Sequence, residues 1–253
     1  MYFGGNGGRL VPEGGLTIGG EAIRRVDGAR FLGVWVDEGI RWSEHIEKVK
    51  LKVGRLLGVL GRASAALGGE SILKLYNALV QPHLQYCLLV WGDFEEGRNK
   101  VLGESLFRHQ KRFLGLIAGI KGSYHSDPMF SKFGKLKIND LYKQQVRVHA
   151  WKFLNNKLPK NQISLLCKVR DAHSHNTRAA KTGLSITTQD HRSVGYRIPK
   201  EWSSLPEKLR EVRSLPGFKN KSKIEFLTMY KSFTCLVHNC YVCSGEGRNV
   251  VHI

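Results

Sequence analysis

The stretch Phe31-Leu32-Gly33-Val34-Trp35-Val36-Asp37-Glu38 leads through Trp42 into a long periodic segment that begins at Ser43. We expect a short apolar strand, a polar turn, and then a helix from about Trp42 to Arg62 with Ser43 as its N-cap. Six apolar residues recur at helical spacing and predict one buried stripe: Ile46, Val49, Val53, Leu56, Leu57 and Leu60. The sequence therefore predicts a strand that runs directly into an amphipathic helix.

Two further amphipathic helices are predicted after the first. One starts near Ser71 and is kinked or split at Pro82, which lacks a backbone donor. Its inward side chains are Ile72, Leu75, Tyr76, Leu79 and Val80. The other spans about Lys100 to Ile120. Its packed side chains are Val101, Leu102, Leu106, Phe113, Leu114 and Ile117, with His109, Lys111 and Arg112 on the polar side. Short connections between these helices predict a three-helix bundle.

The flanking regions complete the predicted fold class, which is mainly α with a small N-terminal antiparallel β meander (α+β). Residues 1–40 hold Gly-rich punctuation and short apolar runs that favour two or three strands. Such a piece is marginal alone, so we expect it to be the edge of a larger, truncated sheet. Residues 41–120 form the bundle. Residues 121–253 have weak periodicity and many turn residues, so we expect an irregular helical region there.

Charge is concentrated in the second half of the chain. Residues 1–105 hold 13 Lys/Arg and 12 Asp/Glu. Residues 106–253 hold 27 Lys/Arg and 9 Asp/Glu and therefore carry nearly all of the total net charge of +19. A positive field of this size attracts polyanions and predicts salt-sensitive binding to phosphate backbones. Aromatic residues lie among these bases, which favours nucleic acid over anionic membrane or a merely basic surface. They are Phe107, Phe113, Tyr124, Tyr142, Trp151 and Phe153.

Several classes of protein are disfavoured by the sequence. There is no apolar run long enough to span a membrane and no signal-peptide pattern at the start. The five cysteines are odd in number and unevenly spread, which favours a reducing compartment over a disulfide scaffold. We therefore expect an intracellular protein of the nucleus, the cytoplasm or both, without a membrane partner.

A family resemblance rests on the order of several short motifs. The 31–36 stretch is followed by Leu75-Tyr76-Asn77-Ala78-Leu79-Val80-Gln81-Pro82-His83-Leu84-Gln85-Tyr86-Cys87 and then by Val90-Trp91-Gly92. Later motifs lie at 126–130, 136–141, 173–178, 195–197, 202–206, 215–219 and 227–230. In this order they resemble the C-terminal part of the reverse transcriptase of jockey-like non-LTR retrotransposons. His175 stands where that family has tyrosine, and Ser203 stands where asparagine is usual.

The resemblance implies a fold and a set of contacts. The Phe-Leu-Gly-Val segment would belong to the primer grip, with Phe31, Leu32 and Gly33 placing the primer end, and the three helices would form the thumb. Basic side chains off the buried stripes are candidates for contacts to the nucleic-acid backbone: Lys48, Lys52, Arg55, Lys111 and Arg112. The implied partners are RNA, DNA or an RNA–DNA hybrid, together with the polymerase and endonuclease regions of a full-length protein.

The catalytic centre of such a polymerase is not in this sequence. Metal-dependent phosphoryl transfer needs clustered carboxylates, and none of the seven aspartates has an aspartate neighbour. Mg²⁺ is implied only for the full-length enzyme, so we expect no cofactor for this chain, which alone would be inactive as an RNA-directed DNA polymerase. The pair Asp37-Glu38 is interpreted as a turn before a helix N-terminus, where carboxylates are favoured, rather than as a metal site.

Two further clusters offer candidate site residues. His173, His175 and Arg178 lie in a segment whose simplest interpretation is a capped loop, with Arg178 meeting phosphate. A metal nuclease would need a nearby acidic ligand, and only Asp171 is offered. The tail holds Cys235, His238, Cys240 and Cys243, which are zinc-ligand types at an unusual spacing; free thiols are the competing interpretation.

Three functions remain open from the sequence. The chain is a truncated reverse transcriptase fragment that binds primer–template or RNA, or a stand-alone nucleic-acid-binding protein derived from a retroelement, or a helical protein-interaction module with incidental basicity. Binding to an RNA–DNA hybrid with a steep salt dependence would separate the first two from the third.

Overall fold

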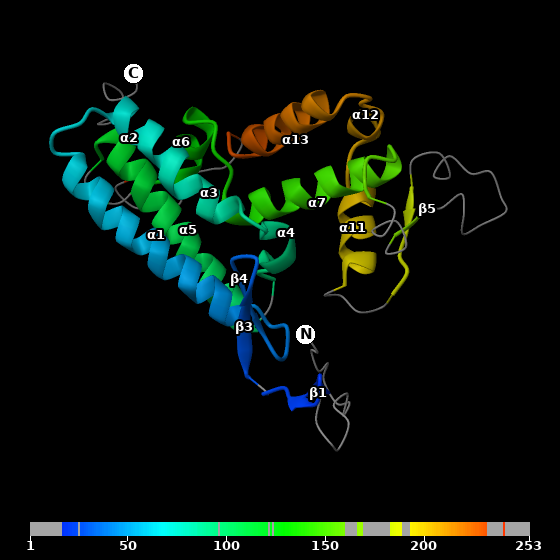
Figure 1. The fold of residues 1–253 in the computed structure, drawn as a ribbon. Coiled ribbons are helices and arrows are strands. Elements are labelled where there is room, and N and C mark those ends of the chain that lie inside the picture. The colour runs from blue at the N-terminus through cyan, green and yellow to red at the C-terminus, as the bar shows by residue number, and fades with distance from the viewer. Residues whose placement is uncertain are drawn as a thin grey trace.

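The computed structural model describes residues 17–24, 26–95, 97–120, 122, 124–159, 166–168, 183–188, 193–231 and 240. Its architecture is mainly helical, with small antiparallel hairpins at the N-terminal end (Figure 1). The predicted fold class is therefore confirmed.

The strands near the N-terminus form two separate hairpins instead of one meander. Strands β1 (Thr17–Ile18) and β2 (Glu21–Ala22) pair with each other, and so do β3 (Gly28–Phe31) and β4 (Val34–Asp37). The stretch predicted as one strand from Phe31 is thus the tip of the second hairpin. Leu32 and Gly33 form its two-residue turn with positive φ angles of 47° and 84°, a geometry that suits the twist of the flanking strands. The prediction missed this turn because Leu32 makes the Leu-Gly pair look like part of a continuous apolar strand.

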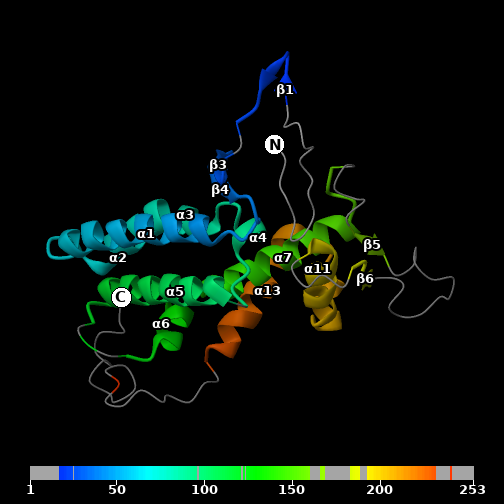
Figure 2. The same ribbon diagram turned by 90° about the horizontal axis from the view of Figure 1, so that it is seen from below.

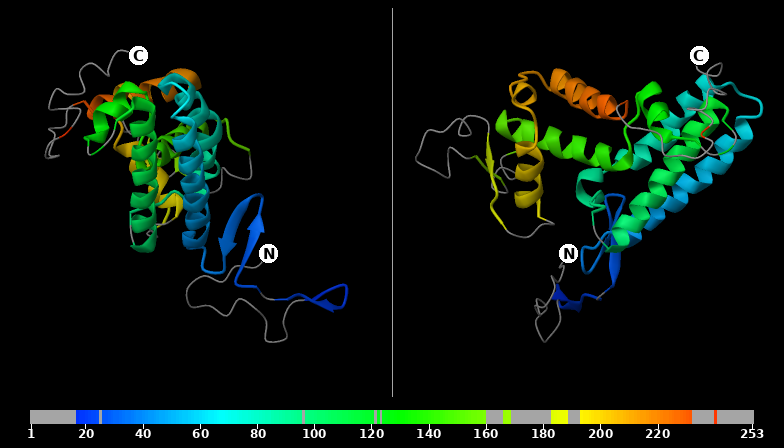
Figure 3. Two further views of the ribbon diagram at one scale, coloured as in Figure 1. Left: turned by 90° about the vertical axis from the view of Figure 1, so that its left-hand side faces the viewer. Right: turned by 180° about the vertical axis from the view of Figure 1, so that it is seen from behind.

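Three helical segments pack as the predicted bundle. Helix α1 (Ser43–Ala63) and helix α5 (Gly97–Ala118) lie side by side and run in the same direction (Figures 1 and 3). At their N-terminal ends the Ser43 hydroxyl donates to Asn99 Oδ1 over 2.8 Å. Between them in sequence, a segment from Gly69 to Gln85 runs back, followed by the short helix α4 (Leu88–Trp91). The connection is therefore up, down and up, which short turns permit.

The returning segment is interrupted where Pro82 predicted a kink. It consists of α2 (Gly69–Leu75), the π-helical segment η1 (Tyr76–Val80) and α3 (Gln81–Gln85). Pro82 has no N–H to donate and its ring would clash with the carbonyl of Ala78 in a regular α-helix. The interruption takes the form of a π turn, which is wider than an α turn and lies one turn before Pro82.

The N-terminus of α1 differs from the prediction. Trp42, with φ 64°, is the N-cap, and Ser43 is the first helical residue. The Asp37 carboxylate accepts hydrogen bonds from the backbone N–H groups of Arg41 and Trp42, at 2.9–3.1 Å. Asp37 therefore stabilises the turn before the helix, because it satisfies donors that have no partner within the helix.

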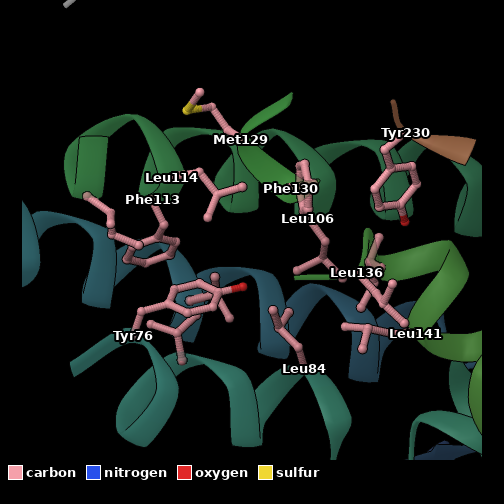
Figure 4. Packing of buried hydrophobic residues seen from close by; sticks show 14 of the residues in the cluster. Tyr76, Leu84, Leu106, Phe113, Leu114, Met129, Phe130, Leu136, Leu141 and Tyr230 are labelled. Carbon is pink, nitrogen blue, oxygen red and sulfur yellow. The ribbon is translucent and has the colours of Figure 1, made fainter. Parts of the chain in front are cut away.

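The predicted buried stripes are largely confirmed. In α1, Ile46, Val53 and Leu60 are buried, and the other three predicted residues pack against the core. Two predictions were wrong, since Leu79 is 42% exposed and Val101 is 60% exposed. Leu79 lies in the π segment, where the helical period changes, and Val101 lies in the first turn of α5. The core of the bundle joins η1, α5 and α6 (Ser126–Lys132) through side chains drawn in Figure 4, among them Tyr76, Phe113 and Phe130.

The region after the bundle contains well-formed helices. Helix α7 (Ile138–Leu154) is followed by α11 (Val194–Ser203), α12 (Glu207–Arg210) and α13 (Leu215–Met229), and β5 (Cys167–Lys168) pairs with β6 (Leu184–Ser185). Both α7 and α13 contribute to two hydrophobic clusters. The first is continuous with the bundle, and the second lies among α7, α11 and α13 (Figure 2). The post-bundle helices are therefore tied to the bundle through shared core residues.

Aromatic residues of the family-like motifs lie in these cores. Trp91, Trp202 and Phe218 are at most 1% exposed. Truncating a buried aromatic side chain typically costs about 3–5 kcal/mol of stability. These motif positions therefore serve packing in this fold.

Candidate nucleic-acid interface

The outer face of α1 carries a row of basic side chains. Lys48, Lys52 and Arg55, which the sequence singled out, are exposed, and so is Arg62, which it did not. Their spacing of three, four and seven residues places them on one side of the helix, opposite the buried stripe. Arg62 could have been found from the same periodicity, because it lies seven residues after Arg55. We call these four residues the α1 row.

Lys48 is the most constrained member of the α1 row. Its Nζ lies 3.2 Å from the centroid of the Trp35 ring and 3.0 Å from Glu44 Oε1. The indole Nε1–H of Trp35 donates to the other carboxylate oxygen of Glu44. These contacts fasten the β3–β4 hairpin to the start of α1 and partly neutralise the Lys48 charge.

The other three members differ from Lys48 in their charge partners. Within the described part of the chain, Lys52, Arg55 and Arg62 have no carboxylate partner. Lys52 lies close enough to His83 of α3 that its charge, added to the larger effect of burial, lowers the pKa of that imidazole. Three uncompensated charges on one helix face favour an anionic partner.

The two bases predicted on α5 point in different directions. Arg112 is exposed, as is Arg108 one turn before it. Lys111 is half-buried on another side, where its Nζ lies 4.9 Å from the Tyr124 ring centroid and its carbonyl accepts from the Tyr124 hydroxyl. The structure therefore separates Lys111 from Arg112.

Glycines bring α1 and α5 close together. A Cβ added at Gly54 would lie 3.2 Å from His109 Nε2, and one at Gly61 would lie 4.0 Å from Leu116 Cδ1. Arg108 and Arg112 lie within one turn of His109 on α5 and are exposed. The exposed bases of α5 therefore belong to the helix that packs directly against α1.

The hairpin tip also lies at the surface. Phe31 is 56% exposed and Leu32 is 75% exposed. The Tyr86 hydroxyl, at the end of α3, donates to the Leu32 carbonyl oxygen, and the Tyr86 ring lies 3.4 Å from the position of a Cβ at Gly33. The two sequence blocks that carry the family resemblance therefore touch each other at this tip.

Aromatic side chains of the basic half do not support base stacking. Phe113, Tyr124, Trp151 and Phe153 are buried, and Phe107 stacks on Phe130 with 5.8 Å between ring centroids. The remaining one, Tyr142, packs against both hydrophobic clusters. Composition alone does not tell core aromatics from stacking ones, and the packing of α5 to α7 uses these side chains in its cores. These six aromatics therefore give no argument for base stacking.

The other candidate sites lie largely outside the described residues. Arg178 with its neighbouring histidines lies there, and so do Cys235, His238 and Cys243. Cys240 is buried, and its Sγ accepts a hydrogen bond from the backbone N–H of His125 over 3.0 Å. Among the residues that the structure describes, no group of three or more His, Cys, Asp or Glu side chains is arranged to hold a metal ion. The zinc hypothesis stays a prediction.

No protein-family model, curated protein or solved structure matches this chain. The resemblance to reverse transcriptases therefore also stays a prediction. In the described ranges, no helix has both the length and the apolar character needed to cross a membrane.

Proposed function

We propose that this chain binds nucleic acid along the outer surface formed by the α1 row and the exposed arginines of α5. The observation that carries the proposal is a set of exposed charges on one face of α1 that have no ion pair with any described residue: Lys52, Arg55 and Arg62. The family resemblance supports the same surface, since these helices would be the thumb that contacts a primer–template duplex. The exposed charges favour a polyanion in general, and the resemblance favours an RNA–DNA hybrid as the ligand to test first.

The dimensions of the α1 row suit a nucleic-acid backbone. Lys48 and Arg62 are fourteen positions apart, which corresponds to about 21 Å along a helix axis. A duplex strand places one phosphate per about 3.4 Å of its axis, so the row spans about six base-pair steps. Lysine and arginine contacts to phosphates position a duplex without reading its sequence. We therefore expect binding with little sequence preference.

A second candidate function has one observation in its favour. Leu51 and Val59 lie on the same outer face of α1 and are 54% and 47% exposed. Aliphatic side chains interspersed with bases also suit an acidic amphipathic helix of a protein partner. The salt dependence of binding and the identity of the ligand separate this candidate from nucleic acid.

The test is fluorescence anisotropy of the full chain with a labelled 20-base-pair RNA–DNA hybrid at several salt concentrations. The variant carries Lys52→Gln, Arg55→Gln and Arg62→Gln. A matched control removes the same charge from helices α11 to α13: Lys200→Gln, Lys208→Gln and Lys221→Gln. Each lost phosphate contact lowers the salt slope by about 1, so the α1 variant should lose about 3.

The control keeps the comparison fair, because both variants lose three positive charges. We expect the control to retain most of the salt slope and affinity. Equal losses in the two variants would mean that only net charge attracts the duplex and that the α1 row is no interface. An absence of hybrid binding by the unmodified chain would refute the proposed function outright.

A further inference from the structure

A polar pocket lies on the flank of α3 that faces away from α1. It is lined by Tyr76 and by the side chains of Gln81 and Gln85 on one wall. The opposite wall is formed by Lys135, in the turn between α6 and α7, by Gln144 of α7 and by Lys223 of α13. The cavity has a volume of about 120 Å³ and is partly open to solvent. Figure 1 shows the elements that surround it: α3, the start of α7 and α13.

Lys135 enters this pocket, and its hydrogen-bond partners among the described residues are neutral side-chain oxygens. Its Nζ donates to the side-chain oxygens of Asn77 and of Gln81, the latter over 3.0 Å. It also lies 5.7 Å from the centroid of the Tyr76 ring. Amide oxygens orient an ammonium group without neutralising it. No residue that lines the pocket has a carboxylate side chain, so the positive charge of Lys135 is not neutralised there.

Lys223 brings a second ammonium group to the same space. Its Nζ lies 3.7 Å from where a Cβ at Gly134 would stand, and Gly134 has a positive φ of 58° that favours glycine. Burial and, secondly, the charge of Lys223 lower the pKa of the Lys135 ammonium. Two like charges held near each other in a half-buried pocket are unfavourable unless an anion joins them.

The remaining polar side chains of the pocket can donate as well as accept. Gln85 and Gln144 each carry an NH₂ group, and an amide can satisfy an oxyanion with its two N–H donors. Gln144 already uses one donor on the carbonyl of Lys219, over 3.1 Å. The pocket therefore combines two cations with amide donors, which is the set that a tetrahedral oxyanion requires.

We propose that this pocket binds a phosphate group between Lys135 and Lys223. The cavity is slightly smaller than the roughly 150 Å³ cavity that accommodates benzene, so it has room for the five heavy atoms of a phosphate but not for a nucleoside. A dianion matches two ammonium groups better than a carboxylate does. The group can come from free phosphate or from the terminal phosphate of an oligonucleotide, which share this chemistry.

The pocket is independent of the α1 row. His83 of α3 lies near Lys52 of α1, whereas Gln81 and Gln85, two residues to either side, line the pocket. The two sites therefore occupy opposite flanks of α3. Variants of the α1 row should leave phosphate binding unchanged, so a failure of either proposal can be told from a failure of the other.

The test is a titration of the full chain with inorganic phosphate at neutral pH and constant ionic strength, followed by ¹H–¹⁵N NMR of side-chain amides. We expect saturable shifts of the Gln81, Gln85 and Gln144 amide signals. Lys223→Gln should weaken binding at least 5-fold, and adding Lys135→Gln should abolish saturation. Lys219→Gln, one turn earlier on α13 and exposed, is the matched control and should change affinity less than 2-fold.

A parallel titration separates the sources of the group. A 5′-phosphorylated dinucleotide that binds more tightly than inorganic phosphate identifies a terminal phosphate as the ligand, and the reverse order identifies free phosphate. The same amide shifts with sodium acetate or chloride would overturn the assignment, as would equal binding by Lys219→Gln and Lys223→Gln. Lys223 makes no hydrogen bond or ion pair with another described residue, so its replacement removes a charge without breaking a contact that holds the fold.

Discussion

Arg147 joins three helices, and its removal should cost much of the stability of their packing. It is 6% exposed on α7. Its Nε donates to Glu201 of α11 and its Nη1 to Glu225 of α13, each over 2.7 Å. The guanidinium also lies 4.2 Å from the centroid of the Phe226 ring. Replacing Arg147 with Met keeps the aliphatic stem but leaves two carboxylates without a partner.

The magnitude follows from the burial of those carboxylates. Breaking a buried ion pair by removing one partner typically costs about 3–5 kcal/mol. The Glu201 and Glu225 side chains are 19% and 27% exposed, so water can still solvate their carboxylates in part when Arg147 is absent. We therefore expect Arg147→Met to lower the free energy of unfolding by about 3 kcal/mol, the lower end of that range.

Urea unfolding followed by circular dichroism measures this change, with Lys143→Met as the matched control. Lys143 is exposed on the same helix and should change stability by less than about 0.5 kcal/mol. Adding Glu201→Leu and Glu225→Leu to Arg147→Met should restore much of the loss, because no buried charge then lacks a partner. A loss below about 1 kcal/mol for Arg147→Met would refute the conclusion that this ion network holds α7, α11 and α13 together.

Three further changes probe local features. Burial and, secondly, a nearby lysine lower the pKa of His45, so the folded protein favours the neutral ring. The free energy of unfolding should therefore fall as the pH drops below about 6.5. In the same unfolding assay, His45→Asn should lose less stability between pH 7 and pH 5 than the unmodified chain. A Cβ at Gly69 would collide with a backbone carbonyl of α5, so Gly69→Ala should cost about 1–3 kcal/mol. At Gly58 a Cβ would meet only Arg62 Nη1, at an ordinary 4.0 Å, so Gly58→Ala should stabilise α1 by up to about 1 kcal/mol. Leu32→Asn places Asn-Gly with Gly33 in the hairpin turn and should raise the melting temperature, because asparagine adopts the positive φ of 47° more readily than leucine; an unchanged or lower value would contradict this reasoning.

The sequence predicted the elements whose periodicity is long and regular. The stripe through Ile46, Val53 and Leu60 defined α1 to within a residue at each end. Pro82 marked the interruption of the returning segment, but not the π turn ahead of it. The hairpin tip at Leu32 was missed, because its turn depends on backbone angles that an apolar sequence does not reveal.

The candidate sites were less predictable, because they depend on contacts between distant segments. Helical spacing placed Lys52 and Arg55 on one face correctly, but it could not show that Lys48 is held by Trp35. Lys135 and Lys223 are 88 positions apart, and no local pattern connects them. Only the packing of α13 against α7 brings them to one pocket.

The residues that carry the family resemblance and the residues proposed to bind are different sets. Trp91, Trp202 and Phe218 are buried aromatic side chains of the motifs, so these positions serve the packing of helices in this fold. Arg55 and Arg62 lie outside the motifs, on a surface that the fold does not constrain. A protein can keep such motifs while its exposed charges change freely, because surface substitutions cost little stability. Nucleic-acid binding by this chain is therefore a question about its own surface charges, and the α1 variant with its charge-matched control addresses it directly.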